Sequence, residues 1–236
     1  MQAVFLLKNL PKKKLKKMID GFDFAAYAGE CGVAEPLKFR NNCEVLRLFL
    51  EEYNQHVNLT RLTSPEDFYF KHAVDSLSIA RIFPELTAAK LSVADIGCGA
   101  GFPSLILAMA FPQLQITAID SIGKKITFVK AAAEKLGLTN LTAIHGRSIE
   151  MNCKKEYQNR FDIVTARAVA PSPKIYHEAK CFIKKDGRFI FYKTPQQAAE
   201  EAPLLANIKG ISWSNTYSFE LPGNAGERLF TVGKKP

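Results

Sequence analysis

Strand-like and helix-like segments alternate in the second part of the chain, and this alternation limits the possible folds more than any other feature. Short runs rich in apolar and β-branched residues predict strands, and the amphipathic segments between them predict helices. A chain that alternates in this way builds a mostly parallel sheet with helices on both faces. The expected strands are 91–96, 115–119, 141–145, 160–165 and 187–193, and the expected helices are 103–111, 123–136 and 171–183.

The two ends of the chain follow other patterns. Residues 1–90 have the spacing of amphipathic helices, and Ser64 before a proline is typical of a helix start. Residues 211–221 and 227–235 predict two strands joined by the short segment PGNAG, which leaves no room for a helix and therefore indicates an antiparallel hairpin. We expect a helical region over residues 1–90, packed against an α/β domain over residues 91–236.

Composition argues against several classes of protein. The longest apolar runs fall far short of the roughly 20 residues that a membrane span needs. At the N-terminus the positive charges follow the apolar patch, which reverses their order in a signal peptide. The five cysteines form no C-x-x-C pair, which argues against a disulfide framework and against a zinc site. We therefore expect a soluble cytoplasmic protein with no membrane contact and no metal.

The chain carries a formal net charge of +9 at pH 7, and such a surface attracts polyanions. A nucleic-acid partner and a merely basic cytosolic protein both fit this charge. The same choice applies to the densest clusters of cations, which are either solvated helix faces or parts of an RNA track. These clusters are Lys12, Lys13, Lys14, Lys16 and Lys17 near the N-terminus and the pair Lys124 and Lys125.

A glycine-rich loop, VADIGCGAGFPS at residues 93–104, lies between a predicted strand and a predicted helix. Its glycines have the spacing G-x-G-x-G, and Phe102 stands where the dinucleotide pattern requires a third glycine. This spacing suits S-adenosylmethionine, because backbone without side chains can approach the amino-acid end of that molecule. A side chain on Gly97 would then fill the space of the methionine end, and Asp95 suits the positive sulfonium.

Two further elements extend this interpretation. Asp120 ends the next predicted strand, where an acid accepts hydrogen bonds from the ribose hydroxyls of a nucleoside cofactor. The segment TARAVAP, residues 165–171, lies where the substrate should bind. It lacks the Asn/Asp-Pro-Pro-aromatic turn of amino-group methyltransferases and the nucleophilic cysteine of enzymes that methylate pyrimidine carbons. A ring nitrogen with a free lone pair, such as guanine N7, needs neither, so we expect no catalytic general base.

Seven short motifs occur together in one order along the chain. They are NLT (58–60), HAVDSL (72–77), DIGCGAGFPS (95–104), DSIGKKITFV (120–129), HGRS (145–148), VTARA (164–168) and GRFIFYK (187–193). With these motifs the chain resembles the bacterial small-subunit ribosomal RNA guanine-N7 methyltransferases, also called glucose-inhibited division protein B. The resemblance implies a class I methyltransferase fold, with a Rossmann-like, mostly parallel seven-stranded sheet and an antiparallel C-terminal hairpin. It also implies S-adenosylmethionine as the donor and 16S ribosomal RNA, free or in the small ribosomal subunit particle, as the substrate.

The resemblance further implies a set of cofactor contacts. They are Gly97 and Phe102 in the glycine loop, Ser148 and Ile149 after the third strand, and Arg167 in TARA, and Asp120 joins them from the argument above. The family usually has an acid at the position of Ile149, whereas here the acid comes one residue later, as Glu150. Either a side chain or only the backbone therefore contacts the adenine at this point. We expect the protein to be a monomer.

Other interpretations remain beside these. Arg167 is either a cofactor contact or a cation that ties the fourth strand to the sheet. His72 and Asp75 have the spacing of a metal or acid/base pair, although we expect hydrogen bonds that hold the N-terminal helices to the sheet. The alternative functions are a class I methyltransferase with a different RNA, protein or small-molecule substrate, a non-enzymatic RNA-binding protein, and an NAD-dependent oxidoreductase.

Overall fold

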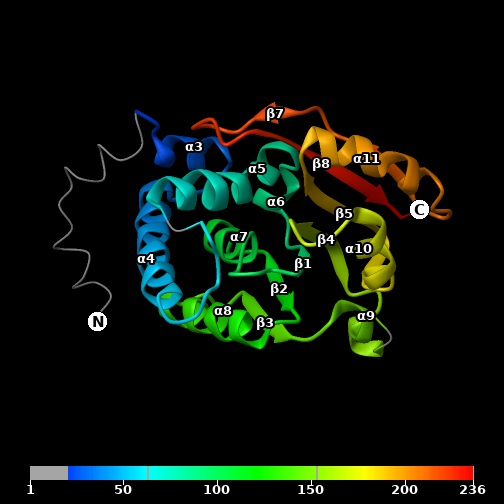
Figure 1. The fold of residues 1–236 in the computed structure, drawn as a ribbon, viewed down its shortest axis with the longest axis horizontal. Helices are drawn as coiled ribbons and strands as arrows, with labels where there is room; N and C mark the ends of the chain where they lie inside the picture. Colours follow the sequence, from blue (N-terminus) through cyan, green and yellow to red (C-terminus); the bar gives the residue numbers. More distant parts are fainter. Residues whose placement is uncertain (1–20, 63, 153, 236) are drawn as a thin grey trace.

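The computed structural model describes residues 21–62, 64–152 and 154–235. Figure 1 shows a central sheet with helices on both sides. The N-terminal elements are α3 (Phe24–Glu30), α4 (Pro36–Asn54), the π-helix η2 (Asp67–Val74), α5 (Asp75–Ile82) and α6 (Glu85–Ala88). The elements that follow are β1 (Ser92–Ile96), α7 (Ser104–Ala110), β2 (Gln115–Asp120), α8 (Gly123–Leu136), β3 (Leu141–His145), α9 (Ser148–Met151), η3 (Lys155–Tyr157), β4 (Phe161–Arg167), α10 (Ser172–Ala179), β5 (Ile183–Lys193), α11 (Pro195–Ala206), β6 (Ser212–Asn215), β7 (Phe219–Glu220) and β8 (Glu227–Lys234).

The strands of the sheet follow the order β3-β2-β1-β4-β5-β8-β6, and the short β7 pairs with β8. Strands β1 to β5 are parallel, whereas β8 runs antiparallel to both β5 and β6. This topology confirms the predicted mostly parallel sheet with an antiparallel C-terminal hairpin. From β1 the chain proceeds to β2 and β3 on one side and later to β4 and β5 on the other. Ligands of such folds bind beyond the carboxyl ends of the strands at this switch point.

Two groups of buried side chains cover the two faces of the sheet. Along β5, Phe189 and Phe191 belong to one group and Ile190 and Tyr192 to the other, as the two-residue period of a strand requires. The group that contains Ile190 and Tyr192 also contains buried residues of α4, α5 and α7, so the N-terminal helices share a core with the sheet. The division of the chain at residue 90 stays a prediction.

The end of α10, the start of β5 and the presence of α11 differ from the expectations. Helix α10 ends at Ala179 and β5 begins at Ile183, because the buried Ile183 pairs with Phe161 in the sheet instead of continuing the helix. Helix α11 was not predicted, although its start carries a capping box between Thr194 and Gln197, a signal that the sequence contains.

The predicted helix start at Ser64 is confirmed, since its hydroxyl accepts a hydrogen bond from the backbone N–H of Asp67 at 3.0 Å. The lysine cluster between Lys12 and Lys17 lies outside the described residues. Within the described part of the chain, no helix is both long and apolar enough to cross a membrane.

Candidate cofactor and substrate pocket

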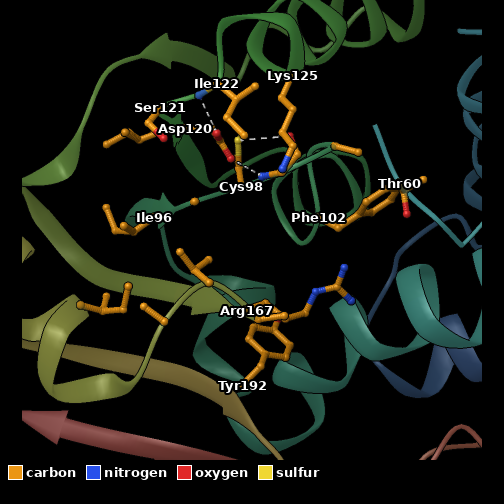
Figure 2. Close-up of a pocket in the computed structure, with 18 of the residues that line it drawn as sticks. Thr60, Ile96, Cys98, Phe102, Asp120, Ser121, Ile122, Lys125, Arg167 and Tyr192 are labelled. Atoms are coloured by element: carbon orange, nitrogen blue, oxygen red, sulfur yellow. Dashed lines mark hydrogen bonds between the residues drawn. The ribbon is translucent and has the colours of Figure 1, made fainter. Parts of the chain in front are cut away.

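A pocket of about 880 Å³ lies beyond the carboxyl ends of β1, β2 and β4 (Figure 2). The six residues that the sequence assigned to the cofactor all line it, namely Gly97, Phe102, Asp120, Ser148, Ile149 and Arg167. We call the part lined by Gly97, Gly99, Asp120, Ile122, Ser148 and Ile149 the β2 side of the pocket. The pocket continues past β4 to a part that we call the β5 side, lined by Lys174, Tyr192, Thr194, Gln197, Ala225 and Arg228.

The three glycines of the loop, Gly97, Gly99 and Gly101, have positive φ angles of 69°, 59° and 87°, but their surroundings differ. A Cβ on Gly97 would lie 2.5 Å from Cγ2 of Val169, and a Cβ on Gly101 would overlap the side chain of Leu105. A Cβ on Gly99 would meet nothing within 4 Å. The expectation that Gly97 leaves room for the methionine end needs correction, because Val169 fills the space next to its Cα. Gly99 is the glycine of the loop that faces open space.

Asp120 connects the glycine loop with the start of α8. Its Oδ2 accepts a hydrogen bond from the Gly99 N–H at 2.9 Å, and its Oδ1 accepts one from the Ile122 N–H at 2.8 Å. Each carboxylate oxygen retains a further lone pair for a ligand. Asp120 is buried to 6% exposure and lines the pocket, so it can hold the loop and bind a pair of hydroxyls at once.

The residues after β3 differ in their access to the pocket. Ser148 is buried and its hydroxyl donates to Glu178 Oε2 at 2.8 Å. Ile149 is 49% exposed and lines the pocket, whereas Glu150 does not line it. In the short helix α9 the shift of the acid by one residue therefore places an apolar side chain where the family has a carboxylate.

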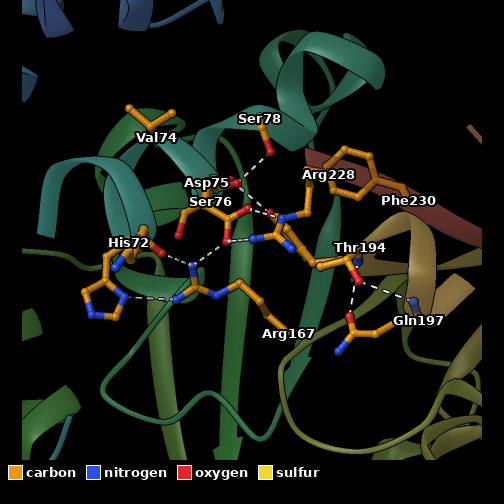
Figure 3. A network of polar contacts seen from close by, with 12 residues as sticks. His72, Val74, Asp75, Ser76, Ser78, Arg167, Thr194, Gln197, Arg228 and Phe230 are labelled. Atoms are coloured by element: carbon orange, nitrogen blue, oxygen red, sulfur yellow. Dashed lines mark hydrogen bonds and ion pairs between the residues drawn. The ribbon is translucent and has the colours of Figure 1, made fainter. Parts of the chain in front are cut away.

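Arg167 belongs to a buried polar network that joins the four elements η2, α5, β4 and β8 (Figure 3). Its Nη1 donates to the Lys71 carbonyl at 2.7 Å and to Asp75 Oδ2 at 2.9 Å. Arg228 of β8 donates from Nε to Asp75 Oδ1 at 2.7 Å. The expectation that His72 and Asp75 hold the N-terminal helices to the sheet agrees with this network. The network supports the interpretation of Arg167 as a structural cation, and because Arg167 also lines the pocket, its cofactor contact stays a prediction.

His72 is held as a neutral ring within this network. Arg167 Nη2 lies 3.1 Å from His72 Nδ1, and since a guanidinium can only donate, Nδ1 accepts and the hydrogen is on Nε2. Burial, followed by the positive charge of Arg167, lowers the pKa of His72 to about 3. The ring stacks on Phe102 with centroids 4.2 Å apart and an angle of 9° between the planes. Phe102 therefore belongs to the wall between the glycine loop and η2.

Asp95 does not have the predicted place beside the cofactor. It is fully buried, it does not line the pocket, and its Oδ2 accepts a hydrogen bond from Ser104 Oγ at 2.5 Å. Burial raises the pKa of Asp95 to about 6, partly offset by this hydrogen bond. The carboxylate points toward the first residue of α7 and not toward the open side of the loop.

Several residues of the pocket were not predicted from the sequence. The NLT motif contributes Leu59 and Thr60, whose backbone N–H groups both donate to Asn54 Oδ1, at 2.7 and 3.0 Å. The motif itself was the signal for this loop. Arg228 and Ala225 come from the C-terminal hairpin, for which the sequence holds no local sign of a site.

Cations dominate the charged side chains at the pocket. Lys125, Arg147 and Lys174 line it and form no salt bridge with another described residue. Among the described residues there is no group of three or more His, Cys, Asp or Glu side chains that could hold a metal ion. The pocket thus combines a nucleoside-type acid, apolar walls and unpaired positive charge.

Comparisons with known proteins agree with this geometry. Among solved structures, an O-methyltransferase from Bacillus cereus in complex with SAH superposes with a TM-score of 0.57 at 15% identity, over 82% of this chain and 91% of that one. A putative O-methyltransferase from Klebsiella pneumoniae gives a TM-score of 0.56 at 12% identity, over 80% of this chain and 89% of that one. These structures share the fold.

Sequence comparisons identify the family. The ribosomal RNA small subunit methyltransferase G of Limosilactobacillus reuteri is 42% identical over 187 residues, which cover 78% of this chain and 77% of the relative. The protein of the same name from Lactobacillus helveticus is 38% identical over 189 residues, 79% of each chain. Residues 41–218 match the family model GidB, described as rRNA small subunit methyltransferase G. The chain therefore belongs to the GidB family of rRNA small subunit methyltransferases.

Proposed function

We propose that this protein transfers the methyl group of S-adenosylmethionine to N7 of a guanine in 16S ribosomal RNA, in the cytoplasm. The observation that carries the proposal is a single pocket with two sides. The β2 side presents Asp120 and apolar residues, which suit a nucleoside cofactor. The unpaired cations Lys125, Arg147 and Lys174 line the same pocket, with Lys174 on the β5 side, and these charges suit RNA. Membership of the GidB family supports ribosomal RNA as the substrate.

The residues of the β2 side fit S-adenosylmethionine. Ile122 and Ile149 are apolar and exposed, by 41% and 49%, and both line the pocket, so they offer apolar contacts to an adenine ring. Asp120 has free lone pairs for the ribose hydroxyls, and Gly99 leaves open space for the amino-acid end. When bound, the cofactor supplies an electrophilic methyl group on its sulfonium.

Methyl transfer to N7 requires the protein mainly to position the acceptor nitrogen. This nitrogen has a free lone pair and no proton to lose, so no general base is required. Catalysis then depends on holding the acceptor nitrogen in line with the methyl group, and orientation of this kind supplies several kcal/mol. His72 lines the pocket with a neutral ring and is therefore no proton donor in this reaction near neutral pH.

Incubation of the purified protein with labelled S-adenosylmethionine tests the proposal, with naked 16S ribosomal RNA and small ribosomal subunits as parallel substrates. We expect label in 7-methylguanine, and the same modified guanine should be absent from ribosomal RNA of cells that lack the gene. Tight RNA binding without any methyl transfer would support a non-enzymatic RNA-binding protein instead. Calorimetry with S-adenosylmethionine and NAD separates the methyltransferase from an oxidoreductase, and label in a protein or a small molecule would identify another substrate class.

A further inference from the structure

Val169 is an exposed apolar side chain in the middle of the pocket. It is 45% exposed and lines the pocket just after β4. In the sheet β4 lies between β1, which carries the glycine loop, and β5, which leads to Thr194 and Gln197. Val169 therefore stands between the β2 side and the β5 side, next to the place where donor and acceptor have to meet.

The backbone around Val169 is adapted to present this side chain. Its two methyl groups lie over Gly97, within 2.6 Å of where a Cβ on that residue would be. The preceding residue, Ala168, has a φ of 55°, a left-handed conformation that is uncommon for a residue with a side chain. Such strain persists where the surrounding structure holds it, and it concentrates at ligand sites.

A buried ion pair anchors the loop that contains Val169. Lys193 Nζ lies 2.7 Å from Glu201 Oε1 and donates to the Ala170 carbonyl at 3.4 Å. Glu201 Oε2 accepts a hydrogen bond from the Ser172 N–H at 2.9 Å. Both charged side chains are buried, at 7% and 9% exposure, so the loop that follows Val169 is attached to β5 and α11.

We propose that Val169 is a substrate-binding residue that supports the flat face of the acceptor guanine beside the methyl donor. The inference rests on the proposed function and adds the residue that orients the base. A purine offers two apolar faces, and valine is stiff at χ1, so its methyl groups form a rigid surface. This chain has no aromatic residue in TARAVAP, and Val169 supplies the apolar contact there.

The test compares Val169→Ala with the wild-type protein in methylation of small ribosomal subunits or 16S RNA. We expect kcat/KM to fall about tenfold, mainly through kcat, because a base without this contact is less often oriented with its N7 in line with the methyl group. The dissociation constant for S-adenosylhomocysteine, measured by calorimetry, should change less than about twofold. Val169→Ile keeps the branched apolar surface and should restore most of the activity. Leu204→Ala, at another exposed apolar residue outside the pocket, is the matched control and should leave kcat/KM unchanged.

Two results would overturn the inference while the proposed function stands. If Val169→Ala retains full kcat/KM, the side chain only covers Gly97. If it weakens S-adenosylhomocysteine binding by the same factor as kcat/KM, Val169 belongs to the cofactor site. A wild-type protein that neither binds S-adenosylhomocysteine nor methylates RNA would instead refute the proposed function itself.

Discussion

The first glycine of the loop packs against a valine that follows the neighbouring strand β4. A Cβ on Gly97 would lie 2.5 Å from Cγ2 and 2.6 Å from Cγ1 of Val169, and Gly97 has a φ of 69°. The residue after β1 is thus matched to the loop after β4, although 72 positions separate them in the sequence (169 − 97).

This contact predicts that Gly97→Ala and Val169→Ala are coupled. Gly97→Ala should lower the free energy of unfolding by more than Gly99→Ala, because both require left-handed backbone but only the first collides with a neighbour. In the Val169→Ala background, Gly97→Ala should lower the free energy of unfolding by about 0.5 kcal/mol less than in the wild-type background, or by less still, because both methyl groups of Val169 are gone. Urea unfolding of the two single variants and the double variant measures this, and strictly additive losses would contradict it.

Asp120→Asn should weaken the binding of S-adenosylhomocysteine about tenfold or more. In the variant an NH2 group replaces one carboxylate oxygen, so either the Gly99 N–H or the Ile122 N–H loses its acceptor. The side chain also loses the negative charge that strengthens hydrogen bonds from the ribose hydroxyls. Asp162→Asn is a matched control, because Asp162 accepts from the Ser92 N–H at 2.8 Å and lies at the opposite end of β4. Calorimetry should show normal affinity for the control and reduced affinity for Asp120→Asn; equal affinities would remove Asp120 from the cofactor site.

His72 makes stability depend on pH in one direction. Its pKa falls from 6.5 to about 3 on folding, so between these values the unfolded chain binds a proton that the folded chain does not. The contribution of the neutral His72 ring to the free energy of unfolding is complete above pH 6.5 and is lost as the pH falls toward 3. Asp95 acts in the opposite sense, because its pKa rises from 3.8 to about 6 and the folded chain binds the proton first in that window.

Comparison of His72→Phe with the wild-type protein isolates the histidine, since Asp95 is present in both. As the pH falls from about 6 to about 4, the wild-type protein should lose roughly 1 kcal/mol per pH unit relative to the variant. Urea unfolding at several pH values provides the free energies. A difference between the two proteins that stays constant with pH would mean that His72 ionises normally in the folded state.

Asp75→Asn should lower the free energy of unfolding by about 3 kcal/mol or more, because it leaves Arg167 and Arg228 without their common buried anion. Glu35→Gln makes the same chemical change in an exposed pair with Lys38 and should cost less than about 1 kcal/mol. Thermal unfolding of both variants provides the comparison. A similar loss for the two would show that the network contributes little to holding the N-terminal helices.

The unpaired cations of the pocket should contribute to RNA affinity through released counterions. Replacing Lys125, Arg147 and Lys174 by alanine should reduce the slope of log affinity against log salt by about 2 to 3. A triple variant of exposed lysines outside the pocket, Lys90, Lys185 and Lys209, has the same change of charge and serves as the control. Equal reductions in both variants would indicate non-specific attraction by net charge alone.

The sequence by itself determined the parallel sheet, its C-terminal hairpin and the place of the glycine loop. These features have local causes: a strand or helix appears in the spacing of its apolar residues, and a tight loop appears in its glycines. Asp120 could be assigned to the pocket for the same reason, because the end of a predicted strand fixes the edge of the sheet where it lies.

Only the tertiary structure decided which side chains meet at that edge. It joined Asp75 to Arg167 and Arg228, which lie 92 and 153 residues away along the chain. It also turned Asp95 away from the pocket and placed Val169 over Gly97. Burial and charge pairing between distant segments leave no local periodicity in the sequence, so these contacts exist only once the sheet has brought β1, β4 and β8 together.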